Sequence, residues 1–226
     1  MEQKTYLSQF QVRLLEIILR EPYLVKNYYW TGGTVLTEFY LHHRESYDLD
    51  LFTEKSEVHL PSIMQFSRKA GKKLGAKKIV SGRFLGLYSF TFILPDDSEL
   101  KIDFNYYPFP RIEVGKKYKA LNVDSLIDIA TNKVHTLFMR PRFRDYIDLY
   151  YILNGQNALS LEKLISLADV KFDWHIDPLQ LGENLTRVVA TTTLKNEPKM
   201  LVPFDRKQME NWYLSLATQL KKDIIK

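Results

Sequence analysis

The sequence of 226 residues contains no cysteine. This absence excludes disulfides, zinc sites built on thiolates and cysteine nucleophiles. The longest apolar runs, such as 90–94, are far shorter than the roughly 20 apolar residues of a membrane-spanning helix. The first ten residues lack the apolar core and the small-residue cleavage site of a secretion signal. We therefore expect a soluble protein of the cytoplasm that makes no contact with a membrane.

The sequence also lacks the motifs of several large enzyme classes. It contains no G-x-S-x-G, no Walker lysine loop, no H-E-x-x-H and no Rossmann glycine pattern. The adjacent His42 and His43 do not form a metal pair, because neighbouring side chains on a helix point roughly 100° apart. Serine hydrolases, P-loop NTPases and zinc proteases are therefore unsupported.

Charge is moderate in total but uneven along the chain. With 32 basic and 27 acidic residues the formal net charge is +5, and 13% of the residues are aromatic, which excludes a disordered chain. The stretch from Arg68 to Lys78 carries six cations and no acid. Such a stretch fits a polyanionic partner, with an ordinary solvated helix face as the alternative.

Hydrophobic periodicity predicts a mixed α/β (α+β) fold, with a core in which helices flank a mixed sheet and with a helical C-terminal subdomain. The expected strands are 28–31, 48–53, 78–80, 85–94 and 99–106, and the expected helices are 6–20, 34–43, 62–74, 124–139, 144–153, 160–168 and 205–225. The range 171–203 reads as irregular. We place the domain boundary near 119–122, which gives a core of 1–120 and a helical subdomain of 121–226.

Two aspartates lie two residues apart in the predicted strand 48–53, whose sequence is DLDLFT. Side chains two apart in a strand project from the same face, so the carboxylates of Asp48 and Asp50 point together. Like charges held this close repel each other unless a cation lies between them, and carboxylate oxygens suit Mg²⁺ or Mn²⁺. The alternative is a solvent-facing edge strand with hydrated acids.

A third acid, Asp103, lies in the predicted strand 99–106 on the face opposite the apolar residues. If this strand pairs with 48–53, three carboxylates converge and could hold one or two divalent ions. Two such ions clamp the attacking and leaving oxygens of a phosphoryl displacement. The alternative is an edge-strand aspartate that pairs with Lys101 or Arg111.

A Gly32-Gly33-Thr34 turn connects the predicted strand 28–31 with the helix that follows. Paired glycines let the backbone approach a ligand, and the N–H groups at a helix start favour phosphate oxygens. The Thr34 hydroxyl could donate to a phosphate or cap the helix. A strand-to-helix turn needs glycine in any case. The order of the parts is the informative feature, because a phosphate cradle one helix ahead of a carboxylate pair suits a triphosphate and a metal.

Lys133 falls within the apolar arc of the predicted helix 124–139. A lysine that faces a core is costly unless it snorkels to solvent or meets an anion. A triphosphate or one of the aspartates described above would be a suitable anion.

The loop RPRFR, residues 140–144, and the helix after it carry further charges. The guanidinium groups of the loop fit phosphate oxygens. Packing of the loop onto the rest of the protein through Phe143 would explain these residues equally well. We expect Asp145 to be the N-cap of the helix. Asp148 has apolar neighbours, so we expect it to pair with an arginine or with Lys133.

Together these segments resemble the AbiEii/AbiGii-type nucleotidyltransferases, a toxin branch of the polymerase-beta-like superfamily. The first block is YWTGGTVLTEFYLHHRESYDLDLFT, residues 29–53, in which a GG-T turn precedes H-R-x-S-x-D-x-D-x-F. The second block is residues 128–153, in which D-I-A-x-x-K precedes R-D-x-x-D-L-Y. The GG-T turn replaces the GG-S or GS of the wider superfamily but keeps the hydroxyl. Residues 155–226 resemble nothing that we can name.

The resemblance implies a Mg²⁺-dependent transfer of a nucleoside monophosphate from an NTP to an acceptor, tRNA or another RNA. It implies a metal and catalytic set of Asp48, Asp50 and Asp103, with Lys133 as a further catalytic residue. The implied nucleotide-binding residues are Gly32, Gly33, Thr34, Arg44, Ser46, Lys133 and Asp148. It also implies that the protein acts as a toxin with a cognate antitoxin protein as partner.

Two other functions fit the same residues. One is a non-catalytic module that binds a nucleotide or a partner, because fold alone does not determine function. The other is an enzyme that nucleotidylates a protein hydroxyl instead of RNA. The intact Asp48/Asp50 pair, Asp103 and the core-facing Lys133 favour catalysis over the binding module.

Overall fold

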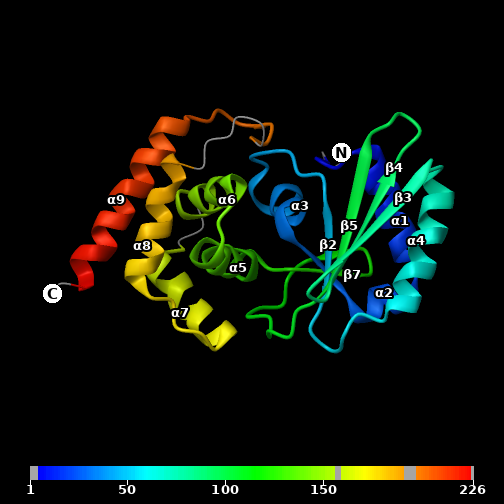
Figure 1. Ribbon diagram of the computed structural model, residues 1–226, viewed down its shortest axis with the longest axis horizontal. Helices are drawn as coiled ribbons and strands as arrows, with labels where there is room; N and C mark the ends of the chain where they lie inside the picture. The colour runs from blue at the N-terminus through cyan, green and yellow to red at the C-terminus, as the bar shows by residue number, and fades with distance from the viewer. Residues whose placement is uncertain (1–4, 156–158, 191–196, 225–226) are drawn as a thin grey trace. The chain divides into compact units, whose positions relative to one another are not determined.

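The computed structural model describes residues 5–155, 159–190 and 197–224. The chain forms two compact units, Met1–Tyr40 with Glu45–Ser125, and Leu41–Arg44 with Leu126–Lys226. The four residues 41–44 therefore pack with the C-terminal part, although the chain on either side of them belongs to the first unit. A mixed sheet with flanking helices confirms the predicted α/β class (Figure 1).

The first unit is built on a seven-stranded sheet of order β3-β4-β5-β2-β1-β7-β6. The strands are β1 (Tyr29–Thr31), β2 (Leu49–Thr53), β3 (Lys78–Phe84), β4 (Leu87–Ile93), β5 (Glu99–Tyr106), β6 (Lys117–Tyr118) and β7 (Leu121–Val123). β2 runs parallel to β5 and antiparallel to β1, and β5 also pairs with β4. Neither β2 nor β5 is an edge strand, so the prediction that their aspartates lie on an edge strand, made in both alternatives, is wrong.

Helices cover the two faces of this sheet differently. α1 (Gln9–Leu19), α2 (Pro22–Asn27) and α4 (Leu60–Leu74) lie on one face, and the short α3 (Gly32–Leu36) lies on the other (Figure 1). A capping box at Ser8 and Gln11 starts α1, and the left-handed Gly75 ends α4. The Phe66 ring of α4 packs edge to face on Phe104 of β5, with centroids 5.9 Å apart.

Alternation along the strands separates an apolar face from a polar one. In β5 Ile102 and Phe104 are fully buried, and in β2 Leu49 and Leu51 are fully buried. These residues face α4 and its neighbours. Because side chains alternate along a strand, the residues between them project toward the face on which α3 lies. The aspartates of both strands are among these residues.

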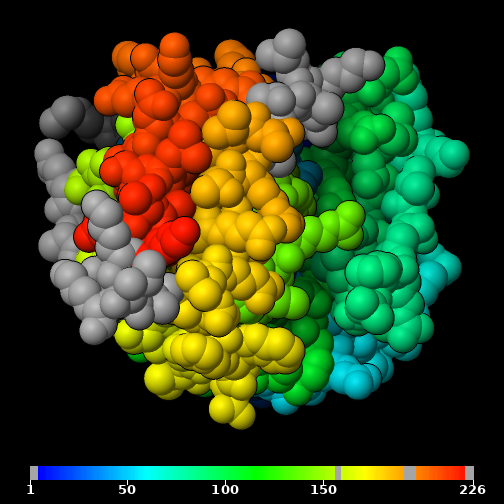
Figure 2. Space-filling model, turned by 60° about the vertical axis from the view of Figure 1, so that its left-hand side comes forward, coloured from blue at the N-terminus to red at the C-terminus, as the bar shows by residue number. Residues whose placement is uncertain are grey.

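The second unit is helical. Its elements are α5 (Leu126–Met139), α6 (Phe143–Leu153), α7 (Leu161–Phe172), α8 (Pro178–Thr186), η2 (Arg187–Val189) and α9 (Arg206–Ile224). α8 and α9 lie side by side at its surface (Figures 1 and 2).

Three buried hydrogen bonds join helices of the second unit. The Tyr146 hydroxyl donates to the Asn184 carbonyl at 2.5 Å, and the Asn184 amide donates to the Phe138 carbonyl at 2.6 Å. The Tyr213 hydroxyl donates to the Tyr146 carbonyl at 2.7 Å. Because these residues belong to four helices, the bonds tie α5, α6, α8 and α9 together.

The structure departs from the sequence-based prediction in several elements. The helix predicted for 34–43 starts at Gly32 and continues from Thr37 to Leu41 as a π-helix, η1. α2, β6 and β7 were not predicted, because each is too short to show a period. The range 171–203 was expected to be irregular but contains α8 and η2, while 191–196 lie outside the described residues. Within the described ranges, no helix combines the length and the apolar character needed to cross a bilayer.

Candidate active site

Asp50 and Asp103 are direct partners across the parallel pair β2–β5. Asp103 is 6% exposed, and its Oδ2 accepts a hydrogen bond from Lys101 Nζ at 2.6 Å. Its Oδ1 is buried and has no hydrogen-bond partner within the described residues. Pairing of Asp103 with Lys101, proposed above as an alternative, is thus present, and it occupies one of the two carboxylate oxygens. The other oxygen is left for a ligand beside Asp50.

Gly32 lies against the Asp50 carboxylate. Its φ is 84°, and a Cβ added to it would lie 2.1 Å from Asp50 Oδ2. Any side chain here would adopt a left-handed conformation and would displace the carboxylate. The start of α3 and the aspartate of β2, which the sequence assigned to one site, are therefore in direct contact.

Thr34 fixes the chain that leads into β2. The residue is 2% exposed, its hydroxyl donates to the Asp48 carbonyl, and it lies 3.0 Å from Ser46 Oγ. The N-cap of α3 is Thr31, so the expectation that Thr34 could cap the helix is wrong. Thr34 and Ser46 thus hold the backbone of Asp48 immediately before the strand.

A buried pair at the end of β1 was missed by the sequence analysis. The Thr31 hydroxyl donates to Asp124 Oδ2 at 2.6 Å, and Thr31 is the register partner of Asp50. The signal for this pair was weak, because nothing in the sequence links a threonine before a glycine turn to an aspartate before α5. The contact anchors the strand that carries the Gly32 turn.

The carboxylates of this unit fit a divalent cation as part of a larger set. Within the described residues, no three histidine, aspartate or glutamate side chains are arranged so that they could hold a metal by themselves. Mg²⁺, however, is commonly held by one or two carboxylates together with substrate phosphates and water. The Asp50–Asp103 pair, with the buried and unpartnered Oδ1 of Asp103, matches that donor set.

In the second unit, Asp148 is the centre of a buried ion-pair network. Its carboxylate is fully buried and accepts hydrogen bonds from Arg44 Nε at 2.6 Å and Arg44 Nη2 at 2.9 Å. His43 Nε2 lies 2.8 Å from Asp148 Oδ1, and Lys133 Nζ lies 2.6 Å from Oδ2. Lys133 Nζ also bonds to Asp145 at 2.7 Å. The prediction that Asp148 pairs with an arginine or with Lys133 is confirmed for both partners.

The network determines the charge of its members. Burial alone would raise the pKa of Asp148, but Arg44, Lys133 and the hydrogen bonds hold it well below its ordinary value. Burial would also raise the pKa of Asp145, but Lys133 and Arg142 together lower it below its ordinary value. Burial lowers the pKa of His43 despite the carboxylate beside it. At pH 7 both aspartates are therefore ionised and His43 is neutral.

Part of the loop before α6 holds the start of that helix in place. Arg142 is the N-cap of α6, and Asp145 accepts a hydrogen bond from its backbone N–H at 3.1 Å. The expectation that Asp145 is the N-cap itself is therefore wrong, although it does complete a capping box. Phe143 is buried, and the Arg206 guanidinium lies 4.7 Å from its ring centroid. Packing through Phe143 thus accounts for the conformation of the loop.

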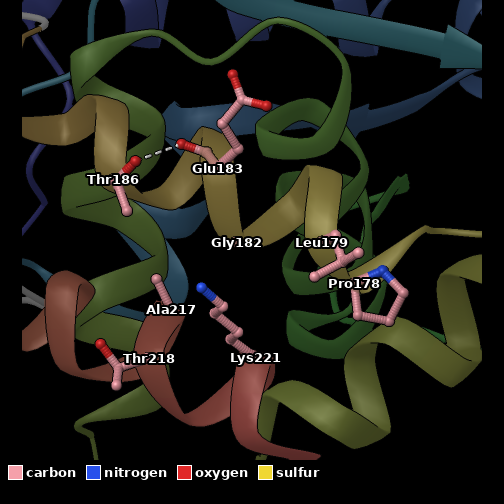
Figure 3. A pocket seen from close by; sticks show the side chains of 8 residues that line it. All are labelled: Pro178, Leu179, Gly182, Glu183, Thr186, Ala217, Thr218 and Lys221. Carbon is pink, nitrogen blue, oxygen red and sulfur yellow. Dashed lines mark hydrogen bonds between the residues drawn. The ribbon is translucent and has the colours of Figure 1, made fainter. Parts of the chain in front are cut away.

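A surface groove lies between α8 and α9 (Figure 3). Its lining residues are Pro178, Leu179, Gly182, Glu183, Thr186, Ala217, Thr218 and Lys221. It contains none of the residues that the sequence assigned to a site. We assign no role in the reaction to this groove.

The predicted site residues therefore fall into two groups. The first unit holds Gly32, Gly33, Thr34, Ser46, Asp48, Asp50 and Asp103, and the second holds Arg44, Lys133, Asp145 and Asp148. In the first group Gly32 contacts Asp50, and Asp50 is the register partner of Asp103. In the second group every member belongs to the Asp148 ion-pair network.

Comparison with solved structures supports the fold. A Helicobacter pylori protein described as a candidate nucleotidyltransferase is similar at a TM-score of 0.62 and 16% identity, over 96% of this chain and 97% of that chain. JHP933 from Helicobacter pylori is similar at a TM-score of 0.57 and 19% identity, over 96% and 94%. MenT4, a nucleotidyltransferase toxin from Mycobacterium tuberculosis, has a TM-score of only 0.48 at 14% identity, over 93% and 86%.

Sequence comparison identifies the family. No curated protein matches the chain. The family model of the nucleotidyl transferase AbiEii toxin, from type IV toxin–antitoxin systems, matches residues 13–217 and thus most of both units. This confirms the resemblance inferred from residues 29–53 and 128–153 and extends it beyond residue 155. The chain is a nucleotidyltransferase that belongs to the AbiEii toxin family.

Proposed function

We propose that this nucleotidyltransferase transfers a nucleoside monophosphate from an NTP to a hydroxyl of RNA, with tRNA as the acceptor, and that it acts as a toxin in this way. The acceptor oxygen forms a bond to the α-phosphorus, the bond from that phosphorus to the oxygen bridging to the β-phosphate breaks, and pyrophosphate leaves. The hydroxyl proton passes to Asp103 Oδ1. The observation that carries the proposal is the Asp50–Asp103 pair with the Gly32 backbone against it.

Asp48, Asp50 and Asp103 are the residues proposed to hold Mg²⁺ or Mn²⁺. When bound, such an ion supplies charge neutralisation at the phosphates. Lys101 has a separate role, because its ammonium group holds Asp103 Oδ2 and so orients Oδ1. The buried position of Asp103 excludes most water from the oxygen that is to accept the proton.

Gly32, Gly33 and Thr34 are the residues proposed to receive the triphosphate. The absence of a side chain at Gly32 keeps the backbone beside the Asp50 carboxylate, and Thr34 and Ser46 hold the chain before β2. Close positioning of the reactants accounts for much of the rate enhancement in phosphoryl transfer.

Lys133, Arg44 and Asp148 are also proposed to act on the nucleotide. The Asp148 carboxylate is fully buried and receives hydrogen bonds from both cations. A fully buried carboxylate acts best by holding other groups in place. We therefore propose that Asp148 positions Arg44 and Lys133, and that Lys133 neutralises triphosphate charge.

Incubation with Mg²⁺, total cellular RNA and protein, and each α-labelled NTP in turn tests the proposal. We expect label from one NTP in RNA of tRNA size. Label in a protein band that survives RNase would instead identify a protein hydroxyl as the acceptor. Absence of label from both, with a folded sample, would favour the non-catalytic binding module.

A further inference from the structure

The pairing of β3, β4, β5 and β2 places one row of residues across the sheet. Gly82 of β3 is the register partner of Ser89, Ser89 is the partner of Asp103, and Asp103 is the partner of Asp50. Directly opposed residues share a face of the sheet. The carboxylates therefore lie in a polar row that continues outward to β3, the edge strand (Figure 1).

The same face is open beyond the carboxylates. We call the residues Val80, Gly82, Phe84, Ser89, Thr91 and Lys101 the hairpin face. Val80 is 46% exposed and Phe84 is 71% exposed, in contrast to the buried residues that face α4. Thr91 is the register partner of both Val80 and Lys101. The hairpin face thus offers an aromatic ring, two hydroxyls and an ammonium group beside Asp103.

The strands β3 and β4 carry two cations, Lys78 and Arg83, and no acid. From Arg68 to Leu94 the sequence has seven basic residues and no acidic one. Within the described residues, Lys69 pairs with Glu21 and Lys77 with Asp97, whereas the other five cations form no ion pair. Three of these five belong to α4, on the other face of the sheet, and Arg83 also points to that face.

Lys78, two residues before Val80, shares the hairpin face. Besides Asp103 of the row itself, the other acid of β5 is Glu99, at the end of the strand remote from Phe84. Lys78 and Lys101 therefore give the hairpin face two cations on either side of Val80 and Thr91, and phosphate groups are the ligands that such cations attract.

The distance between the hairpin and the carboxylates suits a strand of nucleic acid whose end lies at Asp50 and Asp103. Neighbouring strands lie about 4.8 Å apart, so Gly82 lies on the order of 10 Å from Asp103 across β4. A single strand of nucleic acid binds by backbone contacts to cations and by stacking of its bases on aromatic rings. Lys101 and Phe84 supply these two groups on either side of the Gly82–Ser89–Asp103 row.

We infer that the hairpin face binds the single-stranded end of the acceptor RNA and directs its terminal hydroxyl toward Asp103. This rests on the proposed function, because it names the path of the acceptor into the same site. A base stacks on Phe84, the phosphates lie near Lys101 and the hydroxyls of Ser89 and Thr91, and the terminal nucleotide reaches the Asp50–Asp103 pair.

Two single substitutions in β3 provide a matched test. Gly82 and Ser81 are adjacent and exposed but lie on opposite faces of the strand. A Cβ added at Gly82 meets nothing within 4 Å, so Gly82→Glu adds one negative charge to the hairpin face without a clash. Ser81→Glu adds the same charge to the face toward α4. Gly82→Arg adds a positive charge at the same point.

Binding of a fluorescent single-stranded RNA is measured in the Asp50→Asn background, where no transfer interferes. We expect Gly82→Glu to weaken binding several-fold, Gly82→Arg to strengthen it, and Ser81→Glu to change it less than twofold. Phe84→Ala should weaken binding about tenfold, the effect of losing one stacked base. Equal effects of Gly82→Glu and Ser81→Glu, or a larger effect of Ser81→Glu, would overturn the inference, since the RNA would then bind the α4 side or elsewhere.

Transfer by the enzyme with Asp50 intact separates the two claims. Transfer to RNA that is insensitive to Gly82→Glu would support the proposed function and overturn the path over the hairpin face. RNA binding that responds to Gly82→Glu without any transfer would support the hairpin face as an RNA-binding surface and contradict the proposed function. Label in protein alone would overturn both.

Discussion

Replacing Gly32 by alanine should separate backbone strain from damage to the carboxylate pair. The added Cβ would lie 2.1 Å from Asp50 Oδ2 and 2.9 Å from its Cγ, so the carboxylate must move by about 1 Å or more to restore ordinary contact. A misplacement of about 1 Å at a reacting centre can lower the rate about 100-fold. The left-handed φ of 84° adds a stability cost of about 1–2 kcal/mol for a residue with a Cβ.

Gly75→Ala is the matched control. Its φ is 71°, so alanine has a similar backbone cost, but the added Cβ meets only Pro95 Cγ at 3.7 Å. We expect Gly32→Ala to lose at least as much free energy of unfolding as Gly75→Ala in a chemical denaturation, and Gly32→Ala alone to lose transfer of label from an NTP. If Gly32→Ala retained the activity of Gly75→Ala, the contact between the glycine turn and Asp50 would have no part in the reaction.

Three further predictions concern the buried network and the metal. Asp148→Asn removes the charge that faces Arg44 and Lys133, so it should lower the free energy of unfolding in chemical denaturation by about 3–5 kcal/mol. Glu183→Gln, at an exposed ion pair, should lower it by less than about 0.5 kcal/mol, and equal losses would contradict the buried network. Because the pKa of His43 is lowered in the folded protein, the unfolded chain binds more protons below about pH 6.5, and stability should fall as the pH falls there, by at most about 1.4 kcal/mol per pH unit. His43→Gln should reduce that slope in a pH series of thermal melts, and an unchanged slope would contradict a lowered pKa of His43. Chelation of divalent ions should abolish transfer and added Mg²⁺ should restore it, and full transfer in excess chelator would contradict the role proposed for the carboxylates.

The strands of the site could be predicted because their sequences alternate. DLDLFT and ELKIDF each place apolar side chains on one face and acids on the other, and the structure has strands at Leu49–Thr53 and Glu99–Tyr106. The pairing of these two strands could not be derived from alternation. It depends on the order of seven strands in the sheet, and local sequence carries no information on that order.

The position of Lys133 on the helical wheel left two possibilities open, snorkelling to solvent or contact with an anion, and the structure shows contact with two anions, Asp145 and Asp148. The sequence did not identify Arg44 as a partner of Asp148, because hydrophobic periodicity within one helix does not show which distant segment packs against it. The family resemblance implied that Arg44 binds the nucleotide, whereas in the structure its guanidinium group makes a bidentate contact with Asp148.

Some of the missed structure had a local signal. α8 begins with Pro178 after Asp177, whose side chain accepts a hydrogen bond from Gln180 N at 2.8 Å. An aspartate followed by proline is typical of a helix start. The π-helix from Thr37 to Leu41 has no comparable signal, since its residues read as a continuation of α3.

Asp50→Asn in the transfer assay tests the central claim most directly. The substitution keeps the size of the side chain and removes the charge beside Asp103, and Asp96→Asn in the exposed turn before β5 serves as the matched control. We expect transfer of label to RNA to fall at least about 1,000-fold in Asp50→Asn and to stay within twofold of the unmodified protein in Asp96→Asn, with both variants folded. Undiminished transfer by a folded Asp50→Asn would contradict the claim that the Asp50–Asp103 pair is the catalytic centre.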